Sequence, residues 1–320
     1  MNRPNVSRSI TLAILCLVVP VGCGGGDETA PSAGREVRVD GSSTVFRISK
    51  AAQERFSEVR PEIQVVVDKH GTGGGFKRYM EGEVDVIDAS RPARADEAAE
   101  AKAKGLDWIE CLVGYDGITV AVNEKNDFAK SITVAQLKAL WEPESKLTTW
   151  KDLDPSWPDR KISLYSPDSA SGTFEFFTEA VVGKAKSQRK DVQVNADDNQ
   201  LVSGVAGDVD AIGYFGYAYY ASNAGKLNAL SVADGSKPAV GPSPETILDK
   251  TYSPLSRPLY IYVHAAALKR PEVAEFVKFY LDHVGEVSKA AQYVPPTAAD
   301  VEANAKALGQ AAATSPAAAG

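Results

Sequence analysis

The sequence predicts an α/β protein of two lobes joined by a hinge with a cleft. From residue 36 onward, short runs of valine and isoleucine alternate with helical patterns, as expected of a parallel sheet covered by helices. The chain of 320 residues is long enough for two hydrophobic cores. A late strand pattern at residues 257–265 is expected to return to the first lobe, so that two strands connect the lobes.

The elements follow from local patterns, taken in order along the chain. Runs of β-branched residues predict strands, and apolar residues at helical spacing predict the helices between them. The first lobe is expected to hold strands 36–40, 63–68 and 84–89 and helices 48–59, 76–82 and 99–105. Strands 108–113 and 117–123 then cross into a second lobe with helix 133–141, strand 161–166, a helix from Gly172, a turn at 197–200 and the aromatic segment 211–220. Helices 271–283 and 286–292 follow the returning strand.

These elements set the expected domain boundaries. Residues 36–115 and 256–302 form a discontinuous first domain, and residues 116–255 form the second. Residues 303–320 are rich in alanine and contain Pro316, which predicts a disordered tail.

The amino terminus resembles an export signal. Arg3 and Arg8 precede an apolar run at residues 10–19 that is short for a membrane span, which predicts a signal peptide over residues 1–22. The segment PVGC resembles a bacterial lipobox, with Pro20 in place of the usual leucine, and predicts lipidation at Cys23. Residues 23–35 then form a tether, and the protein is expected in the periplasm or at the cell surface, anchored by lipid to a bacterial membrane. The alternative is ordinary signal-peptide cleavage nearby.

Charge excludes one class of partner. The chain has 35 lysines and arginines against 42 aspartates and glutamates, a net charge of −7. An acidic protein is a poor nucleic-acid binder, so no nucleic-acid partner is expected. Any bound anion must be held by local dipoles and hydrogen bonds.

Three segments share one design that suits such an anion. They are GSSTVF at residues 41–46, GTGGGF at 71–76 and SASGTF at 169–174, each placed between a predicted strand and a predicted helix. The first amides of a helix lack intrahelical partners, and the helix dipole favours negative charge there. Together with hydroxyl groups they form a pocket for a tetrahedral oxyanion.

Particular residues are expected to bind this anion. The first segment offers Ser43, Thr44 and the backbone of Val45, although serine and threonine also cap helices that have no ligand. The second offers Thr72 and Gly73, where consecutive glycines indicate close approach to a ligand or a flexible turn. The third, in the other lobe, offers Ser171, Gly172 and Thr173.

Ser90 and Arg91 extend this set. They follow the strand at 84–89 directly, at the sheet edge where α/β proteins bind ligands. The planar guanidinium of Arg91 can donate two hydrogen bonds to one oxyanion. The alternative is that Arg91 forms a surface ion pair with a neighbouring glutamate.

The sequence argues against an enzyme. No GxSxG motif occurs, and His70, His264 and His283 have neither triad nor metal-ligand spacing. We expect no catalytic residue, no metal and no cofactor. Cys111 lies among apolar residues and is expected to be a buried, inert thiol.

Taken together, these motifs resemble the substrate-binding lipoproteins of bacterial phosphate importers of the ABC type. The resemblance rests, in family order over residues 36–296, on GSSTVF, GTGGGF, DASRPA, SGTFEFF, DDNQLVSGV, GYFGYAYY and PLSRPLYIYV. It implies a type II periplasmic binding protein fold, a monomer that captures inorganic phosphate between its lobes, and a membrane permease as partner. Binding of sulfate or another oxyanion remains an alternative, and hydrolysis of phosphate esters a remote one.

The chain departs from one branch of this family at two positions. That branch has aspartate where Arg91 stands, and arginine where Pro167 stands, so the guanidinium is expected in the other lobe. The family aspartate accepts the proton of hydrogen phosphate. Asp168 is the expected substitute, with Asp116 behind it.

Overall fold

The computed structural model describes residues 35–314. The predicted signal peptide, Cys23, the tether up to residue 34 and residues 315–320 therefore lie outside the described residues. Arg35, predicted as the end of the tether, begins the first strand. No helix between residues 35 and 314 has the length and apolar character needed to cross a membrane.

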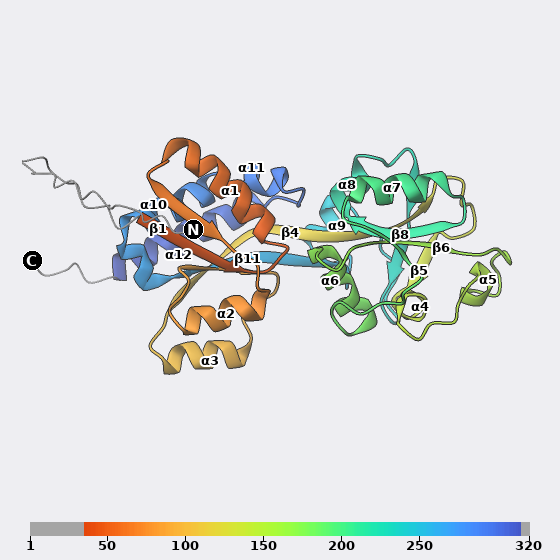
Figure 1. Cartoon of the computed structure of the whole chain (residues 1–320), viewed down its shortest axis with the longest axis horizontal. Coiled ribbons are helices and arrows are strands. Elements are labelled where there is room, and N and C mark those ends of the chain that lie inside the picture. The colour runs from red at the N-terminus through yellow and green to blue at the C-terminus, as the bar shows by residue number, and fades with distance from the viewer. Residues whose placement is uncertain (1–34, 315–320) are drawn as a thin grey trace, which may run out of the picture. The chain divides into compact units, whose positions relative to one another are not determined.

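The first lobe contains a parallel sheet covered by helices (Figure 1). Its β-branched runs form strands because such side chains pack well on a pleated surface. The strands are β1 (Arg35–Gly41), β2 (Ile63–Val67) and β3 (Val86–Ala89). The helices are α1 (Phe46–Val59), α2 (Thr72–Met80), α3 (Ala95–Ala103), the 3-10 helix η2 (Ala265–Lys269), α10 (Pro271–Asp282), α11 (Val284–Ala290) and α12 (Ala298–Thr314).

The second lobe has its own mixed sheet. Strand β6 (Ser163–Pro167) pairs in parallel with β7 (Gln193–Asn195) and β8 (Ala211–Gly216). The remaining strands are β5 (Ser131–Thr133), β9 (Leu227–Ala229) and β10 (Ser231–Ala233). The helices are α4 (Val134–Trp141), α5 (Trp150–Leu153), α6 (Gly172–Phe177), the π-helix η1 (Thr178–Val182), α7 (Asp198–Gly207), α8 (Tyr217–Ala221) and α9 (Pro244–Leu248).

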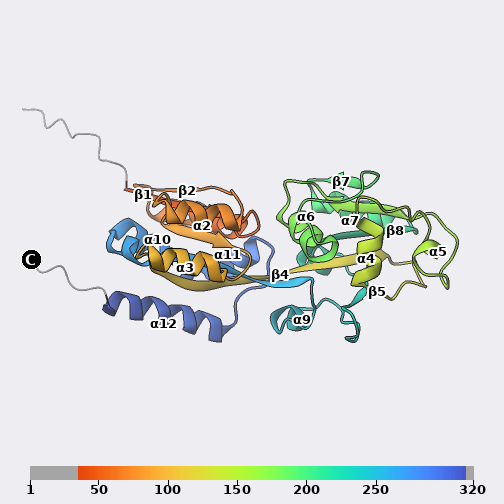
Figure 2. The same cartoon turned by 90° about the horizontal axis from the view of Figure 1, so that it is seen from below.

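Two antiparallel strands, β4 (Trp108–Asn123) and β11 (Ser256–His264), connect the lobes (Figures 1 and 2). Together they join the sheets in the order β2-β1-β3-β11-β4-β8-β6-β7. β4 is one strand where the sequence predicted two. Its first part pairs with β11 up to Gly117, and from Ile118 onward it pairs with β8. The predicted two-lobed α/β fold with a two-strand connection is confirmed.

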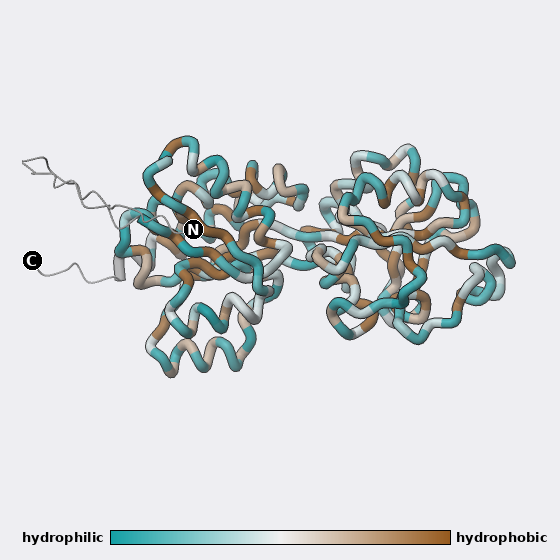
Figure 3. Tube along the Cα trace, viewed as in Figure 1, coloured by the Kyte–Doolittle hydropathy of each residue, from teal (hydrophilic) through white to brown (hydrophobic). Residues whose placement is uncertain are grey.

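Separate hydrophobic cores lie beneath the helices of each lobe, and Figure 3 shows the hydrophobic residues concentrated along the strands. One core holds Val39, Ile48 and Phe276 of the first lobe, and another holds Leu137, Trp141 and Tyr214 of the second. Cys111 is buried in the first-lobe core, and burial raises the pKa of its thiol to about 12, as expected of an inert cysteine.

The predicted disordered tail is wrong for residues 303–314, because they belong to helix α12 (Figure 2). Alanine has the highest helix propensity, so an alanine-rich segment forms a helix where it can dock. The buried Asn304 side chain accepts a hydrogen bond from the Leu112 amide at 3.0 Å and donates one to the Leu112 carbonyl at 2.8 Å. The Tyr115 hydroxyl adds a hydrogen bond to Asp300 at 3.1 Å.

Candidate functional site

The first hydroxyl segment forms a tight turn between β1 and α1. The Ser42 amide donates to the Asp88 carbonyl at 2.8 Å, and the Ser42 hydroxyl accepts from the amides of Thr44 and Val45 at 3.2 and 3.4 Å. Thr44 and Val45 are buried, and the Val45 side chain packs in the first-lobe core. Val45 can therefore reach a ligand through its backbone amide and not through its side chain. Ser43 is half-buried at the centre of the turn.

The second segment is mostly helical, which differs from the predicted loop. Gly71, with φ of 83°, precedes α2, and Gly73 and Gly75 lie in its first turns. A Cβ at Gly75 would lie 2.7 Å from the Asp40 carbonyl oxygen, so this glycine permits close packing of α2 on β1. A Cβ at Gly73 would meet nothing nearer than the Arg91 guanidinium at 4.0 Å.

The second segment adjoins both the first segment and Ser90. The Gly71 amide donates to the Gly41 carbonyl at 2.7 Å, which joins the two turns. The Thr72 hydroxyl accepts from the Ser90 amide at 3.2 Å and lies 3.3 Å from the Ser90 hydroxyl. The predicted first-lobe residues thus gather at the carboxyl ends of β1 and β3.

The third segment belongs to the second lobe and lies against the first segment. The Ser171 hydroxyl caps α6 by accepting from the Thr173 amide at 3.2 Å. Gly172 lies against the first lobe so closely that a Cβ there would be 2.4 Å from the Thr44 hydroxyl oxygen and 2.9 Å from its backbone nitrogen. Here the predicted residues of the two lobes meet.

Arg257, on β11, lies at this meeting point and was not among the predicted residues. Its guanidinium donates to the Thr44 hydroxyl at 2.7 Å, to the Gly172 carbonyl at 3.4 Å and to the Asp116 carboxylate at 3.3 Å. The group also lies over the Phe176 ring, 3.8 Å from its centroid. Arg257 therefore touches the first lobe, the second lobe and the neighbouring connecting strand at once. An arginine directly before the apolar run of β11 was the available signal in the sequence.

Arg91 has a different environment. Its guanidinium makes two hydrogen bonds of 2.8 Å to the Glu97 carboxylate, which also accepts from the Arg94 amide. The side chain is 25% exposed. In this structure Arg91 therefore forms an ion pair with a neighbouring glutamate, which was the alternative to a ligand contact. Arg91 nevertheless remains next to Gly73 at the edge of the site.

The carboxylates near the third segment differ in burial. Asp168 accepts a hydrogen bond from the Ala170 amide at 3.0 Å and stabilises the turn before Ser171. Asp116, on β4, is 1% exposed and lies beside Arg257. Burial raises the pKa of the Asp116 carboxyl above its ordinary value, and the positive charge of Arg257 acts against this rise. Asp116 is therefore a buried carboxyl whose charged partner, Arg257, also contacts Thr44 and Gly172.

The other histidines and acids in the described part of the chain do not gather into a metal site. Between residues 35 and 314, no group of three or more His, Cys, Asp or Glu side chains could hold a metal ion. His70 contacts the Asp40 carboxylate at 2.7 Å. The site as described thus offers hydroxyls, backbone amides and guanidinium groups, which are the donors that an oxyanion requires.

Comparisons with known proteins place the chain in a family. Residues 27–283 match the model of the PBP superfamily domain. Protein SphX of Synechococcus elongatus (strain ATCC 33912 / PCC 7942 / FACHB-805) is 43% identical over 261 residues, which are 81% of this chain and 77% of that protein. The phosphate-binding protein PstS of Staphylococcus aureus (strain USA300) is 38% identical over 275 residues, 85% of this chain and 82% of PstS.

A solved structure agrees. The crystal structure of a possible phosphate binding protein from Planctomyces limnophilus DSM 3776 has 48% sequence identity and a TM-score of 0.83, covering 86% of this chain and 98% of that one. The chain therefore belongs to the PBP superfamily, in the family that includes the phosphate-binding protein PstS.

Proposed function

We propose that this protein captures inorganic phosphate outside the cytoplasm and delivers it to the membrane permease of an ABC importer, without acting as an enzyme. The main support for this proposal is the contact of Arg257 with Thr44 of the first lobe and with Gly172 of the second. A guanidinium held between two helix amino termini rich in hydroxyls suits a tetrahedral anion. The names of PstS and of the Planctomyces protein favour phosphate as that anion.

The proposed ligand set combines the predicted residues with Arg257. The hydroxyls and amides come from Ser43, Thr44, Val45, Thr72, Gly73, Ser90, Ser171, Gly172 and Thr173. Arg91 remains a proposed contact at the edge of the site, available when its guanidinium turns from Glu97. The protein acts as a monomer, because a single chain supplies both walls of the site.

A titration of the purified protein tests this function. Calorimetry with phosphate is expected to show saturable binding, and the same titration with sulfate is expected to show much weaker binding. Comparable binding of both anions would favour the alternative that the protein binds sulfate or other oxyanions. Release of phosphate from a simple phosphomonoester would instead support the hydrolase alternative.

We expect Asp116→Asn to reduce the preference for phosphate over sulfate. Hydrogen phosphate and sulfate have the same charge, so discrimination requires a buried acceptor that pairs with the phosphate proton and repels sulfate. An amide can donate as well as accept, so the asparagine would tolerate sulfate. The ratio of the two dissociation constants should narrow by about tenfold, ~1.4 kcal/mol.

The contrasting variant is Asp168→Asn, which alters the acceptor predicted from the sequence. If Asp168→Asn narrows the ratio while Asp116→Asn leaves it unchanged, the proton acceptor is Asp168. Thermal unfolding of both variants without ligand controls for loss of the buried ion pair with Arg257.

We also propose that Cys23 is lipidated and anchors the protein to the membrane. The native protein is expected in the membrane fraction, and Cys23→Ser is expected to accumulate unprocessed or unlipidated protein. Mass spectrometry of the mature amino terminus measures the modification directly. An unmodified amino terminus in a fully soluble fraction would favour ordinary cleavage.

A further inference from the structure

Asp198 is a buried carboxylate that the proposed ligand set does not use. It is the first residue of α7, follows the N-cap Asp197, and is 4% exposed. Its Oδ1 atom has no hydrogen-bond partner among the described residues. A buried carboxylate oxygen without a partner destabilises the arrangement that buries it, because the lost hydration is not replaced.

The groups that face Asp198 come from both lobes. Asp197 from its own helix start and Tyr219 from α8 belong to the second lobe, whereas Arg47 belongs to α1 of the first lobe. Asp116 on β4 faces it as well. Arg47 in turn interacts with Tyr293, and also with Asp198, Tyr219 and Asp116. Tyr293, which follows α11, faces Asp198 as well. The surroundings of Asp198 therefore depend on how closely α1 approaches α7.

These neighbours do not fully offset the burial. Burial raises the pKa of Asp198 to about 6, and the charge of Arg47 and a hydrogen bond with the Tyr219 side chain oppose that rise without cancelling it. The start of α7 also favours a negative charge, and the pKa is raised nonetheless. At neutral pH the carboxylate is therefore charged in an environment that disfavours its charge.

We propose that Asp198 limits closure of the two lobes, and that Arg47 partly relieves this limit. Separation of the lobes hydrates the carboxylate, and closure removes that water again. Asp198 thus keeps the affinity for the ligand below what the ligand contacts alone would give, which favours release. This inference rests on the proposed function, in which the lobes close on phosphate.

The variant Asp198→Asn tests this proposal. It keeps the shape of the side chain and removes the charge, so phosphate should bind about tenfold more tightly at pH 7.5. The matched control is Asp197→Asn, because Asp197 is the exposed neighbour and asparagine also caps helices. We expect the control to bind phosphate like the parent.

The dependence on pH adds a signature that a change in packing would not produce. The pKa of Asp198 in the closed arrangement is about 6, above its ordinary value of 3.8. Protonation therefore favours closure as the pH falls below about 6, and this advantage is lost as the pH rises through that value. The difference between parent and Asp198→Asn should shrink when both are titrated at pH 5.

Two outcomes would overturn the proposal. Binding by Asp198→Asn that is equal to the parent at pH 7.5 would show that the carboxylate does not oppose closure. Weaker binding would show that it holds the lobes together or contacts phosphate.

A second variant keeps the proposal testable if Asp198→Asn does not fold. Arg47→Met removes the opposing positive charge, so phosphate binding should weaken, and it should weaken less in the Asp198→Asn background. Unchanged phosphate binding by Arg47→Met would contradict the proposal that Arg47 offsets the charge of Asp198 when the lobes close.

Small-angle scattering without phosphate separates this inference from the proposed function. Asp198→Asn is expected to have a smaller radius of gyration than the parent, because its lobes close more readily. If the parent binds no phosphate, the proposed function fails, while this comparison still tests the role of Asp198. An equal radius for both proteins would count against the inference.

Discussion

Arg257→Ala is expected to weaken phosphate binding by at least about tenfold, because a charge-assisted hydrogen bond in a buried site contributes ~1.5–3 kcal/mol. The substitution removes the group that touches Thr44, Gly172 and Asp116 together. It also breaks the ion pair of the buried Asp116 carboxylate and leaves only the more distant charge of Arg47 to offset its burial, which should lower the melting temperature. Calorimetric titration with phosphate measures the first effect, and thermal unfolding without ligand measures the second.

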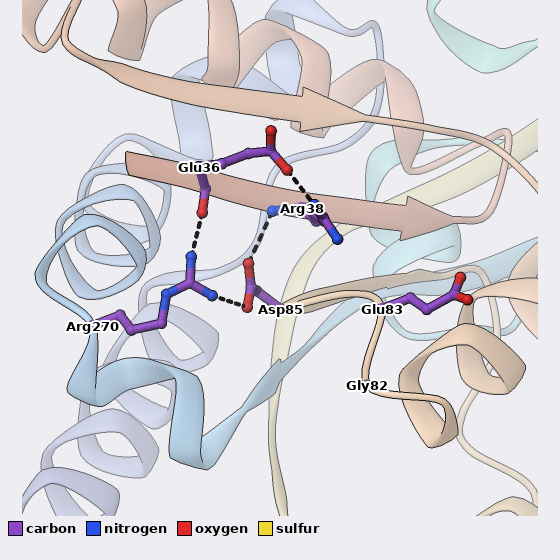
Figure 4. A pocket seen from close by; sticks show the side chains of 6 residues that line it. All are labelled: Glu36, Arg38, Gly82, Glu83, Asp85 and Arg270. Atoms are coloured by element: carbon purple, nitrogen blue, oxygen red, sulfur yellow. Dashed lines mark hydrogen bonds and ion pairs between the residues drawn. The ribbon is translucent and has the colours of Figure 1, made fainter. Parts of the chain in front are cut away.

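The matched control is Arg270→Ala. Arg270 lies at the start of α10 and bonds to Asp85 at 2.7 Å and to the Glu36 carbonyl, in a pocket of about 270 Å³ that Figure 4 shows. This pocket adjoins the first residues of β1, whereas the candidate site lies at the carboxyl ends of the strands. Arg270→Ala should therefore leave phosphate binding unchanged. If Arg257→Ala folds and binds phosphate as the parent does, Arg257 does not belong to the binding site.

Arg91→Ala gives a further comparison within the same site. Its guanidinium already has a bidentate partner in Glu97, so a contact with phosphate would have to replace that ion pair. We expect a smaller loss of affinity than for Arg257→Ala. A larger loss of affinity for Arg91→Ala than for Arg257→Ala would show that Arg91 is the principal guanidinium that contacts phosphate.

Gly172→Ala is expected to prevent the lobes from meeting and to reduce phosphate affinity by at least about tenfold, ~1.4 kcal/mol. The added Cβ would lie 2.9 Å from the Thr44 nitrogen and 3.0 Å from its Cα, and these backbone atoms cannot turn aside as a side chain could. The conflict arises between the lobes and not within either core. The melting temperature without ligand should therefore stay close to that of the parent, while calorimetry shows the lost affinity.

Gly207→Ala serves as its control. Gly207 ends α7, and a Cβ there would meet nothing within 4 Å. Alanine favours helix more than glycine does, so stability should hold or rise slightly, with phosphate affinity unchanged. If Gly172→Ala binds phosphate like Gly207→Ala, the close contact between Thr44 and Gly172 is not needed for binding.

Local patterns in the sequence predicted most of the fold. Alternating β-branched and amphipathic segments placed the central strands and helices, because each pattern reflects burial on one face of one element. The helix α12 escaped prediction because its order depends on a distant contact, that of Asn304 with Leu112. Nothing in an alanine-rich segment indicates such a partner.

The candidate site was predictable only in part, for a similar reason. The hydroxyl turns are local signals, and they gather at one edge because parallel strands end there. Arg257 lies in strand β11, 213 positions along the chain from Thr44, and only the pairing of β11 with β4 brings it beside Asp116. Conversely, Glu97, six positions after Arg91, was close enough in sequence to be considered as its partner.

The position of Asp116 and Arg257 on the connecting strands has a mechanical consequence. A rotation displaces each atom in proportion to its distance from the axis, and these two residues lie where β4 exchanges β11 for β8 as its partner. Atoms near this exchange move little when the lobes rotate, whereas the end of α12 in the first lobe and α5 in the second, which lie far from it, move most (Figure 2). A small rearrangement around a ligand at Asp116 and Arg257 is therefore expected to become a larger displacement at the outer surfaces of the two lobes.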